Sequence, residues 1–252
     1  MFLHGNGASG GMWRKHAAAL KDYHVLLPDL PGFGASASEA WPSLPEVADA
    51  VGDIIRSHAA DGKAHIVGLS LGGCVAFQLL ARHPKIVDHA VIDGAGVLPI
   101  RGVGLLKIGL RLAQPFLHTR LAIRLLARML HIPSSGFDDF ARDLGRMSSS
   151  SFTRAFIEAL RMGEPPGLLQ AAVPTLLVAG EREDHRSSRY LAAVMPHAAA
   201  YAAPGWHGWT AVHPDLHVEM VRAFIEDRPL PAALRRLEAT PSSVAPVRHA
   251  EA

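Results

Sequence analysis

Gly68-Leu69-Ser70-Leu71-Gly72 is the stretch of this 252-residue sequence that decides its fold. The serine stands between two glycines in the pattern G-x-S-x-G, directly after an apolar run and directly before a helical pattern. In that context the pattern predicts a tight, strained turn between a strand and a helix, with the serine hydroxyl exposed at the edge of a sheet. Glycines suit the flanking positions because side chains there would clash. Ser70 is therefore a candidate nucleophile, and the alternative is that it only caps the helix.

Strand and helix patterns alternate on both sides of this turn. Short apolar runs bounded by Gly, Pro or Asp predict parallel strands that are covered on both faces. Helices are predicted over 71–82, over 215–226 and from the capping box Ser43-Leu44-Pro45-Glu46 onward. The alternation predicts an α/β protein with a doubly wound, mostly parallel sheet. The predicted strands, besides one that ends near Leu3, are 23–27, 64–69, 87–93, 175–179 and 198–202.

The pattern changes between residues 97 and 170. Leu, Arg and Ala recur there at helical spacing and no strand is indicated. We interpret 97–170 as a helical cap inserted between the two parts of an α/β core, 1–96 and 171–227. Residues 228–252 are rich in Ala, Ser and Pro and have no apolar period after Leu237, so they are predicted to form a mobile tail.

One of the fifteen histidines stands where a general base is expected. A serine hydroxyl becomes an effective nucleophile only when a nearby base takes its proton. His207 lies in a glycine-containing loop, 203–209, between the last predicted strand and the last predicted helix, and the base follows the serine in this chain order. His207 is therefore the candidate base. The alternative is a histidine that only packs within the loop.

Four motifs together resemble the landmarks of the α/β-hydrolase superfamily, in particular its cap-bearing esterase- and lipase-like serine hydrolases. They occur in the family's order, and the resemblance covers residues 2–227. It implies an oxyanion hole made by the backbone N–H groups of Asn6 and Leu71, with His4 in a structural role. The motifs are His4-Gly5-Asn6-Gly7, Pro28-Asp29-Leu30-Pro31-Gly32-Phe33-Gly34, Gly68 to Gly72, and His207-Gly208-Trp209.

The sequence departs from that family at its first residues. The family normally has two further strands before the strand that ends in His-Gly, whereas here that strand starts at Met1. The expected fold therefore lacks the first two strands, and its sheet should begin with an exposed edge at 23–27. Since open edges invite pairing with another chain, either the natural start lies upstream or the protein is marginal or associates through this edge.

Three carboxylates are candidates for the acid that holds the base. In the family this residue is usually Asp, three residues past a Gly after the penultimate strand. Glu183 has that spacing after Gly180, and Glu is an accepted substitute. Asp184 has the usual residue type but comes one position late. Asp93 ends the preceding predicted strand, where some relatives carry the acid. Glu183 is preferred, with Asp93 and Asp184 as alternatives.

These residues point to hydrolysis of a carboxylic ester, or of a related small acyl substrate, through an acyl-Ser70 intermediate. A thioesterase, a C–C hydrolase, a perhydrolase and an acyltransferase are alternatives, because each can use Ser, His and an acid on this fold. A non-catalytic ligand-binding protein is the alternative from another class. The activity is expected to rise with pH as His207 becomes neutral, with an apparent pKa near 6.5–7.

Composition narrows the range of partners. A formal net charge of +2 is too small to suggest nucleic-acid binding. No metal-ligand spacing, phosphate loop or dinucleotide fingerprint is present, so no cofactor or metal is expected. The absence of a long apolar run, of a signal-peptide pattern and of a second cysteine favours the cytoplasm. The oligomeric state is not indicated.

The first half of the predicted cap is basic. Between residues 97 and 133 it has six basic residues and no acidic one. A solvated helix face is one interpretation, and attraction of an anionic substrate or a weak contact with an anionic membrane is the other. The six residues are Arg101, Lys107, Arg111, Arg120, Arg124 and Arg128.

Overall fold

A computed structural model describes residues 1–98, 103–130 and 132–241 of the chain, and within them six strands form one sheet in the order β1-β2-β3-β4-β5-β6. Every neighbouring pair is parallel except the last, in which β6 runs antiparallel to β5. The doubly wound, mostly parallel sheet predicted from the sequence is confirmed. The strands are β1 (Phe2–Leu3), β2 (Ala64–Leu69), β3 (Val87–Asp93), β4 (Thr175–Gly180), β5 (Ala198–Ala203) and β6 (Arg235–Arg236).

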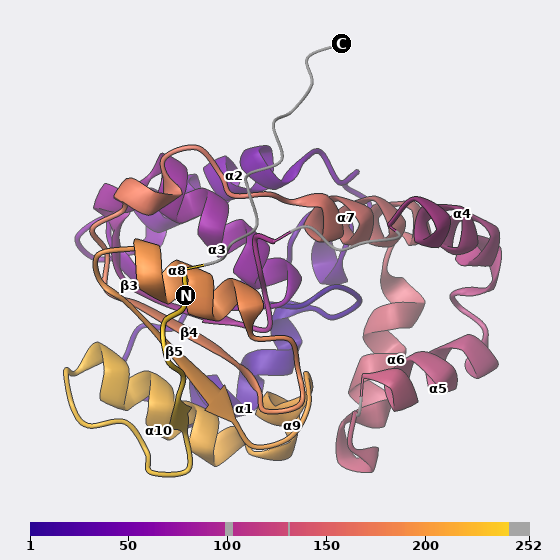
Figure 1. Ribbon diagram of the computed structural model, residues 1–252. Helices are drawn as coiled ribbons and strands as arrows, with labels where there is room; N and C mark the ends of the chain where they lie inside the picture. The colour runs from indigo at the N-terminus through magenta and orange to yellow at the C-terminus, as the bar shows by residue number, and fades with distance from the viewer. Residues whose placement is uncertain (99–102, 131, 242–252) are drawn as a thin grey trace.

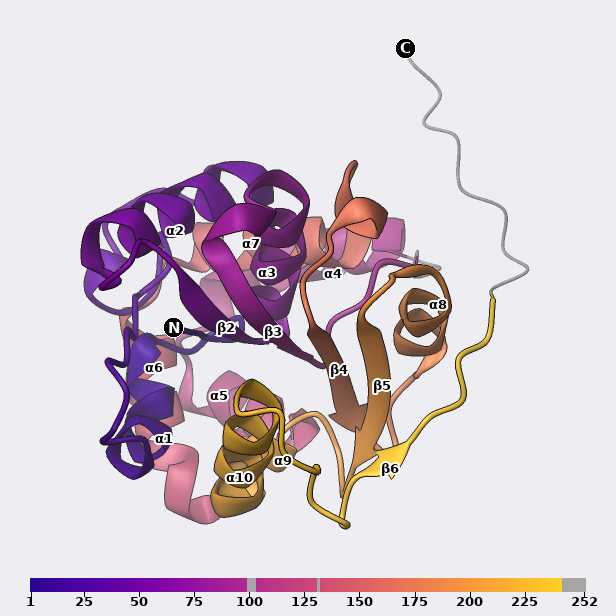
Figure 2. The same ribbon diagram turned by 90° about the vertical axis from the view of Figure 1, so that its left-hand side faces the viewer.

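Helices cover both faces of the sheet (Figure 2). On one face lie α2 (Leu44–His58), α3 (Leu71–Arg82) and α8 (Arg186–Val194), and on the other lie α1 (Arg14–Ala19) and α10 (Pro214–Ile225). Each face has its own buried apolar cluster, because the strands are apolar on both sides. Ser43 caps α2 by accepting a hydrogen bond from the backbone N–H of Glu46, as the capping box predicts.

The helices α4 to α7 lie between β3 and β4 in the chain and project from the sheet on one side (Figure 1). Partly buried hydrogen bonds join them to the rest of the molecule. The Trp41 indole N–H and the Leu44 N–H both donate to the Glu158 carboxylate, at 2.8 and 2.9 Å. The Ser9 hydroxyl donates to Asp143 at 2.7 Å. The bounds are α4 (Val103–Ala113), α5 (Arg120–Met129), α6 (Phe137–Arg146), α7 (Ser149–Arg161) and, after β5, α9 (Trp209–Val212).

Two predicted segments differ from the structure. Residues 23–27 are not a strand. They lie beside the two-residue strand β1, but the backbone hydrogen bond from the Phe2 N–H to the Leu26 C=O does not extend into a ladder. The predicted tail from residue 228 contains β6, whose pairing with β5 is flanked by the buried side chains of Leu234 and Leu237. Residues 242–252 of that tail, and Arg101 of the basic cap, lie outside the described residues.

No helix in the described ranges is long and apolar enough to cross a membrane.

Candidate active site

Ser70 lies in the turn between β2 and α3, directly after the carboxyl end of β2. Its backbone has φ 55° and ψ −110°, a conformation that a non-glycine residue adopts only under strain. A Cβ on Gly68 would come within 2.4 Å of the Gly72 carbonyl oxygen, and a Cβ on Gly72 within 2.3 Å of the Leu3 carbonyl oxygen. The turn is therefore as tight as the G-x-S-x-G pattern predicts. Strain of this kind is typical of a side chain held for chemistry.

His207 lies in the loop after β5 and forms a short hydrogen bond with Glu183 from the loop after β4. The Nδ1 atom of His207 and the Oε2 atom of Glu183 are 2.7 Å apart. The other oxygen of this carboxylate accepts a hydrogen bond from the backbone N–H of Gly180 at 2.8 Å. Both oxygens of Glu183 are thus fixed, and the ring of His207 is held through Nδ1, which leaves Nε2 for another partner.

Asp184, the neighbour of Glu183, faces a different partner. Its carboxylate accepts hydrogen bonds from the backbone N–H and the guanidinium of Arg186, at 3.0 and 2.8 Å. The hydrogen bond to Arg186 holds the pKa of Asp184 below its usual value. Within the described residues His207 forms no hydrogen bond with Asp184 or with Asp93. Of the three acids considered from the sequence, Glu183 is the one that meets the imidazole.

The charge on His207 depends on two opposing effects. Burial lowers the pKa of His207, because the charged ring is poorly solvated. The hydrogen bond to Glu183, the charge of Glu183 and the nearby Asp93 raise it, and together they leave the pKa above its usual value of 6.5. His207 therefore stays protonated to a higher pH than a free histidine.

This shift predicts the pH dependence of any reaction in which His207 acts as a base. The neutral ring is the active form, so kcat/KM should rise with pH through a midpoint above 6.5, the usual value of the histidine pKa. The measurement is kcat/KM against pH with an ester whose own chemistry is pH-independent over that range. A midpoint at or below the usual histidine value would contradict the arrangement described here.

Asp93 ends β3 and is followed by Gly94, which the ring of His207 approaches. It is fully buried, and within the described residues neither of its carboxylate oxygens has a hydrogen-bond partner of ordinary geometry. The ring comes close because residue 94 is a glycine with φ 58°, and a Cβ there would lie 2.5 Å from the His207 Cε1 atom. Burial, followed by the charge of Glu183, raises the pKa of Asp93 to about 8, against smaller opposing effects of Trp209 and His207.

The raised pKa of Asp93 predicts a pH-dependent cost to stability. Between pH values near the usual Asp pKa and about 8, the folded state binds a proton that the unfolded state has released. Folding stability due to this group therefore falls as the pH rises through that range. Asp93→Asn should raise the Tm relative to the wild type more at about pH 9 than at about pH 5. A Tm difference that does not grow with pH would contradict it.

One cavity adjoins Ser70 and Glu183. It has a volume of about 230 Å³ and is lined by Ser70, Glu183, Asn6 and Leu71, and by apolar side chains of α7. The structure thus places the two residues expected to form an oxyanion hole on the same cavity as Ser70. The remaining lining residues include Leu98, Phe156, Leu160, Arg186 and Ser187. Phe156 and Leu160 of α7 could not be identified from the sequence as lining residues, because no local pattern shows which helix lies beside Ser70.

His4 holds the loop that follows β1. Its ring is fully buried, with Nδ1 2.9 Å from the Gly5 carbonyl oxygen, and Nε2 accepts a hydrogen bond from the Leu30 N–H at 3.0 Å. This agrees with the structural role expected for it. Ser70, by contrast, makes no side-chain hydrogen bond within the described residues, and none joins it to His207.

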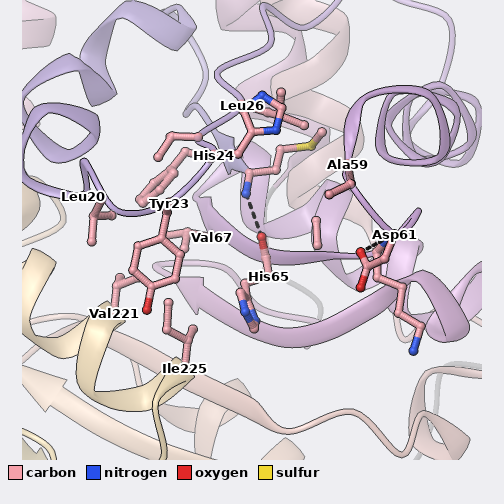
Figure 3. Close-up of a pocket in the computed structure, with 16 residues that line it drawn as sticks. Leu20, Tyr23, His24, Leu26, Ala59, Asp61, His65, Val67, Val221 and Ile225 are labelled. Carbon is pink, nitrogen blue, oxygen red and sulfur yellow. Dashed lines mark hydrogen bonds between the residues drawn. The ribbon is translucent and has the colours of Figure 1, made fainter.

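Another cavity, of about 190 Å³, lies at the start of β2 beside β1 (Figure 3). Leu20, Val67, Val221 and Ile225 give it an apolar lining, and the amino group of Met1 donates to the His65 carbonyl at 2.7 Å. Because His65 and Ser70 stand at opposite ends of β2, this cavity is separate from the Ser70 site. No group of three or more His, Cys, Asp or Glu side chains that could hold a metal ion occurs in the described part of the chain.

The chain is similar to a known protein family and to several characterised proteins. The family model described as alpha/beta hydrolase fold matches residues 1–156. Over 98 residues the chain is 43% identical to a pimeloyl-[acyl-carrier protein] methyl ester esterase of Aeromonas hydrophila, a match that covers 38% of this chain and 36% of that protein. It is 30% identical over 99 residues to an AB hydrolase superfamily protein of Gibberella zeae, covering 38% of this chain and 35% of that protein. The match thus spans about a third of the length of these curated relatives.

Solved structures share the fold over most of the chain. An esterase from Exiguobacterium antarcticum superposes with a TM-score of 0.76 at 17% sequence identity, over 89% of this chain and 90% of that chain. At this identity the likeness concerns the fold and not the substrate.

Proposed function

Because this chain belongs to the alpha/beta hydrolase fold family, we propose that it is a serine hydrolase that cleaves a carboxylic ester through an acyl-Ser70 intermediate. The observation that carries the proposal is the 2.7 Å hydrogen bond between His207 Nδ1 and Glu183 Oε2, together with Ser70 on a strained turn of the same site. A nucleophile, a base and a group that orients the base are the parts that acyl transfer by serine requires.

Acylation would begin at Ser70. His207 Nε2 takes the hydroxyl proton as Oγ attacks the carbonyl carbon of the ester, and the carbonyl oxygen becomes an oxyanion. The backbone N–H groups of Leu71 and Asn6 stabilise the oxyanion by donating hydrogen bonds to it. Each such donor contributes about 3–4 kcal/mol to transition-state stabilisation. The imidazolium then gives its proton to the departing alcohol oxygen as the C–O bond breaks, and the acyl-Ser70 ester is left.

Deacylation repeats the steps with water. His207 takes a proton from the water that attacks the acyl carbonyl, and returns it to Ser70 Oγ as the acid leaves. Glu183 stabilises the imidazolium in both halves because its carboxylate faces the protonated Nδ1. The largely apolar cap side of the cavity, with Phe156 and Leu160, suits an apolar part of the substrate. The esterase name of the Aeromonas relative agrees with an ester as substrate.

A fluorophosphonate tests this proposal directly. It phosphonylates a serine only where that serine is activated, so labelling should be stoichiometric, should block ester hydrolysis, and should map to the peptide that contains Ser70. Labelling elsewhere, or none, would overturn the proposal. A panel of p-nitrophenyl esters of graded chain length, with thioesters alongside, would then separate the esterase from a thioesterase.

A further inference from the structure

Large apolar side chains are exposed mainly on one part of the cap. Of the eight that are exposed in the described part of the chain, six belong to α4, α5 and the short 3₁₀ turn between them, 114–116. Leu112 and Leu121 are 72% and 68% exposed. Within α4 and within α5 these side chains recur one helical turn apart, and exposed apolar patches usually mark a contact with another molecule. We call this set the outer cap surface: Ile108, Leu112, Phe116, Leu121, Leu125 and Met129.

Arginines run beside these apolar residues. Arg120, Arg124 and Arg128 are exposed and recur every four residues on α5, while Ile123 and Ala127 face the interior. At about 100° per residue, the arginine row and the apolar row Leu121, Leu125 and Met129 occupy neighbouring sectors of the exposed half of the helix. Arg111 stands beside the exposed Leu112 on α4 in the same way.

Within the described residues, no acidic side chain pairs with the arginines of this surface. Arg111, Arg120, Arg124 and Arg128 form no salt bridge with any described residue. No acidic residue occurs in α4, in the turn or in α5. A second copy of this chain would not supply negative charge in a two-fold contact of α5 with α5, because α5 has no acidic residue. The partner must therefore combine an apolar region with negative charge.

We infer that the outer cap surface docks on an anionic lipid bilayer. An exposed helix with adjoining apolar and arginine rows can insert its apolar side chains below the headgroups while the guanidinium groups bind lipid phosphates. The long arginine side chains can place their charge in the headgroup region while their methylenes stay beside the acyl chains. The weak membrane contact predicted for the basic cap is thereby assigned to particular residues. Lys107 is left out of this assignment, because its side chain is not among those that the structure describes.

Co-sedimentation with vesicles tests this inference independently of hydrolysis, since the Ser70→Ala protein can be used so that lipid is not consumed. The vesicles are phosphatidylcholine alone and phosphatidylcholine with roughly one-third phosphatidylglycerol. We expect binding to the anionic vesicles, weakened by salt, and at least about tenfold less binding to the neutral ones.

Two variants and one control assign the binding to the surface. Arg120→Gln/Arg124→Gln/Arg128→Gln and Leu121→Ser/Leu125→Ser should each weaken binding to anionic vesicles at least about tenfold, with unchanged circular dichroism. Lys15→Gln/Arg235→Gln/Arg236→Gln removes the same charge from exposed positions elsewhere and should bind as the parent does.

Several results would overturn the inference. They are no binding of the parent to anionic vesicles, equal binding to neutral ones, or equal losses in the control and the arginine variant. A concentration-dependent dimer in sedimentation velocity that Leu121→Ser/Leu125→Ser abolishes would show that a second copy covers the surface instead.

Discussion

Ser70→Ala is expected to lower kcat/KM for an ester substrate at least about 10³-fold while the protein stays folded. The loss follows because no other oxygen on the cavity can form the acyl intermediate in the same place, next to the residues expected to form the oxyanion hole. Activity above the uncatalysed rate should persist, because donors that stabilise the oxyanion act without the nucleophile. The measurement is kcat/KM on a p-nitrophenyl ester, with the Tm measured in parallel.

Ser187→Ala is the matched control for this result. Ser187 lines the same cavity, but its hydroxyl accepts a hydrogen bond from the Leu98 N–H at 3.1 Å and lies on α8, not on the strained turn. Its removal should change kcat/KM only a few-fold, on the order of one lost hydrogen bond. Full activity in Ser70→Ala would show that the protein does not work through an acyl-Ser70 intermediate.

The central part of the fold was predictable because it depends on local pattern. The bounds of β2, α3 and β3 agree with the sequence prediction at every end, since an apolar run, a glycine turn and a His-Pro stop mark them. The segment 23–27 has a strand-like composition, but the short β1 beside it offers one hydrogen bond instead of a ladder. The strand β6 escaped prediction because it consists of two exposed arginines whose pairing is set by β5.

The candidate site also has residues that the sequence could predict and one that it could not. Ser70 and His207 could be proposed from the chain because a turn motif and the chain order mark each of them. The acid could not be singled out from the sequence, because Glu183, Asp184 and Asp93 all lie just after strands, where the acid is expected. Which of the three side chains points toward His207 is not determined by the local sequence. Only the three-dimensional structure shows that Asp184 pairs with Arg186, that Asp93 is buried, and that Glu183 binds His207 Nδ1.

Glu183→Gln is expected to lower kcat about 10²- to 10⁴-fold with little change in Tm. The amide can still accept the Gly180 N–H through its oxygen, so the side chain should keep its place. Its NH₂ group would then face His207 Nδ1 and donate to it, which moves the ring proton to Nε2. A ring with the proton on Nε2 cannot take the proton of Ser70, and the imidazolium loses its counter-charge. The measurement is kcat at a pH above the rising limb, with the Tm recorded for each variant.

Asp93→Asn and Asp184→Asn complete this experiment. Asp184 is paired with Arg186, so its loss should leave kcat within a few-fold of the wild type. Asp93 forms no hydrogen bond with His207 among the described residues, so Asp93→Asn should leave the plateau of kcat within about tenfold. If Asp93→Asn alone costs more than about tenfold in plateau kcat, in a protein with wild-type Tm at acid pH, then Asp93 and not Glu183 is the acid that holds His207.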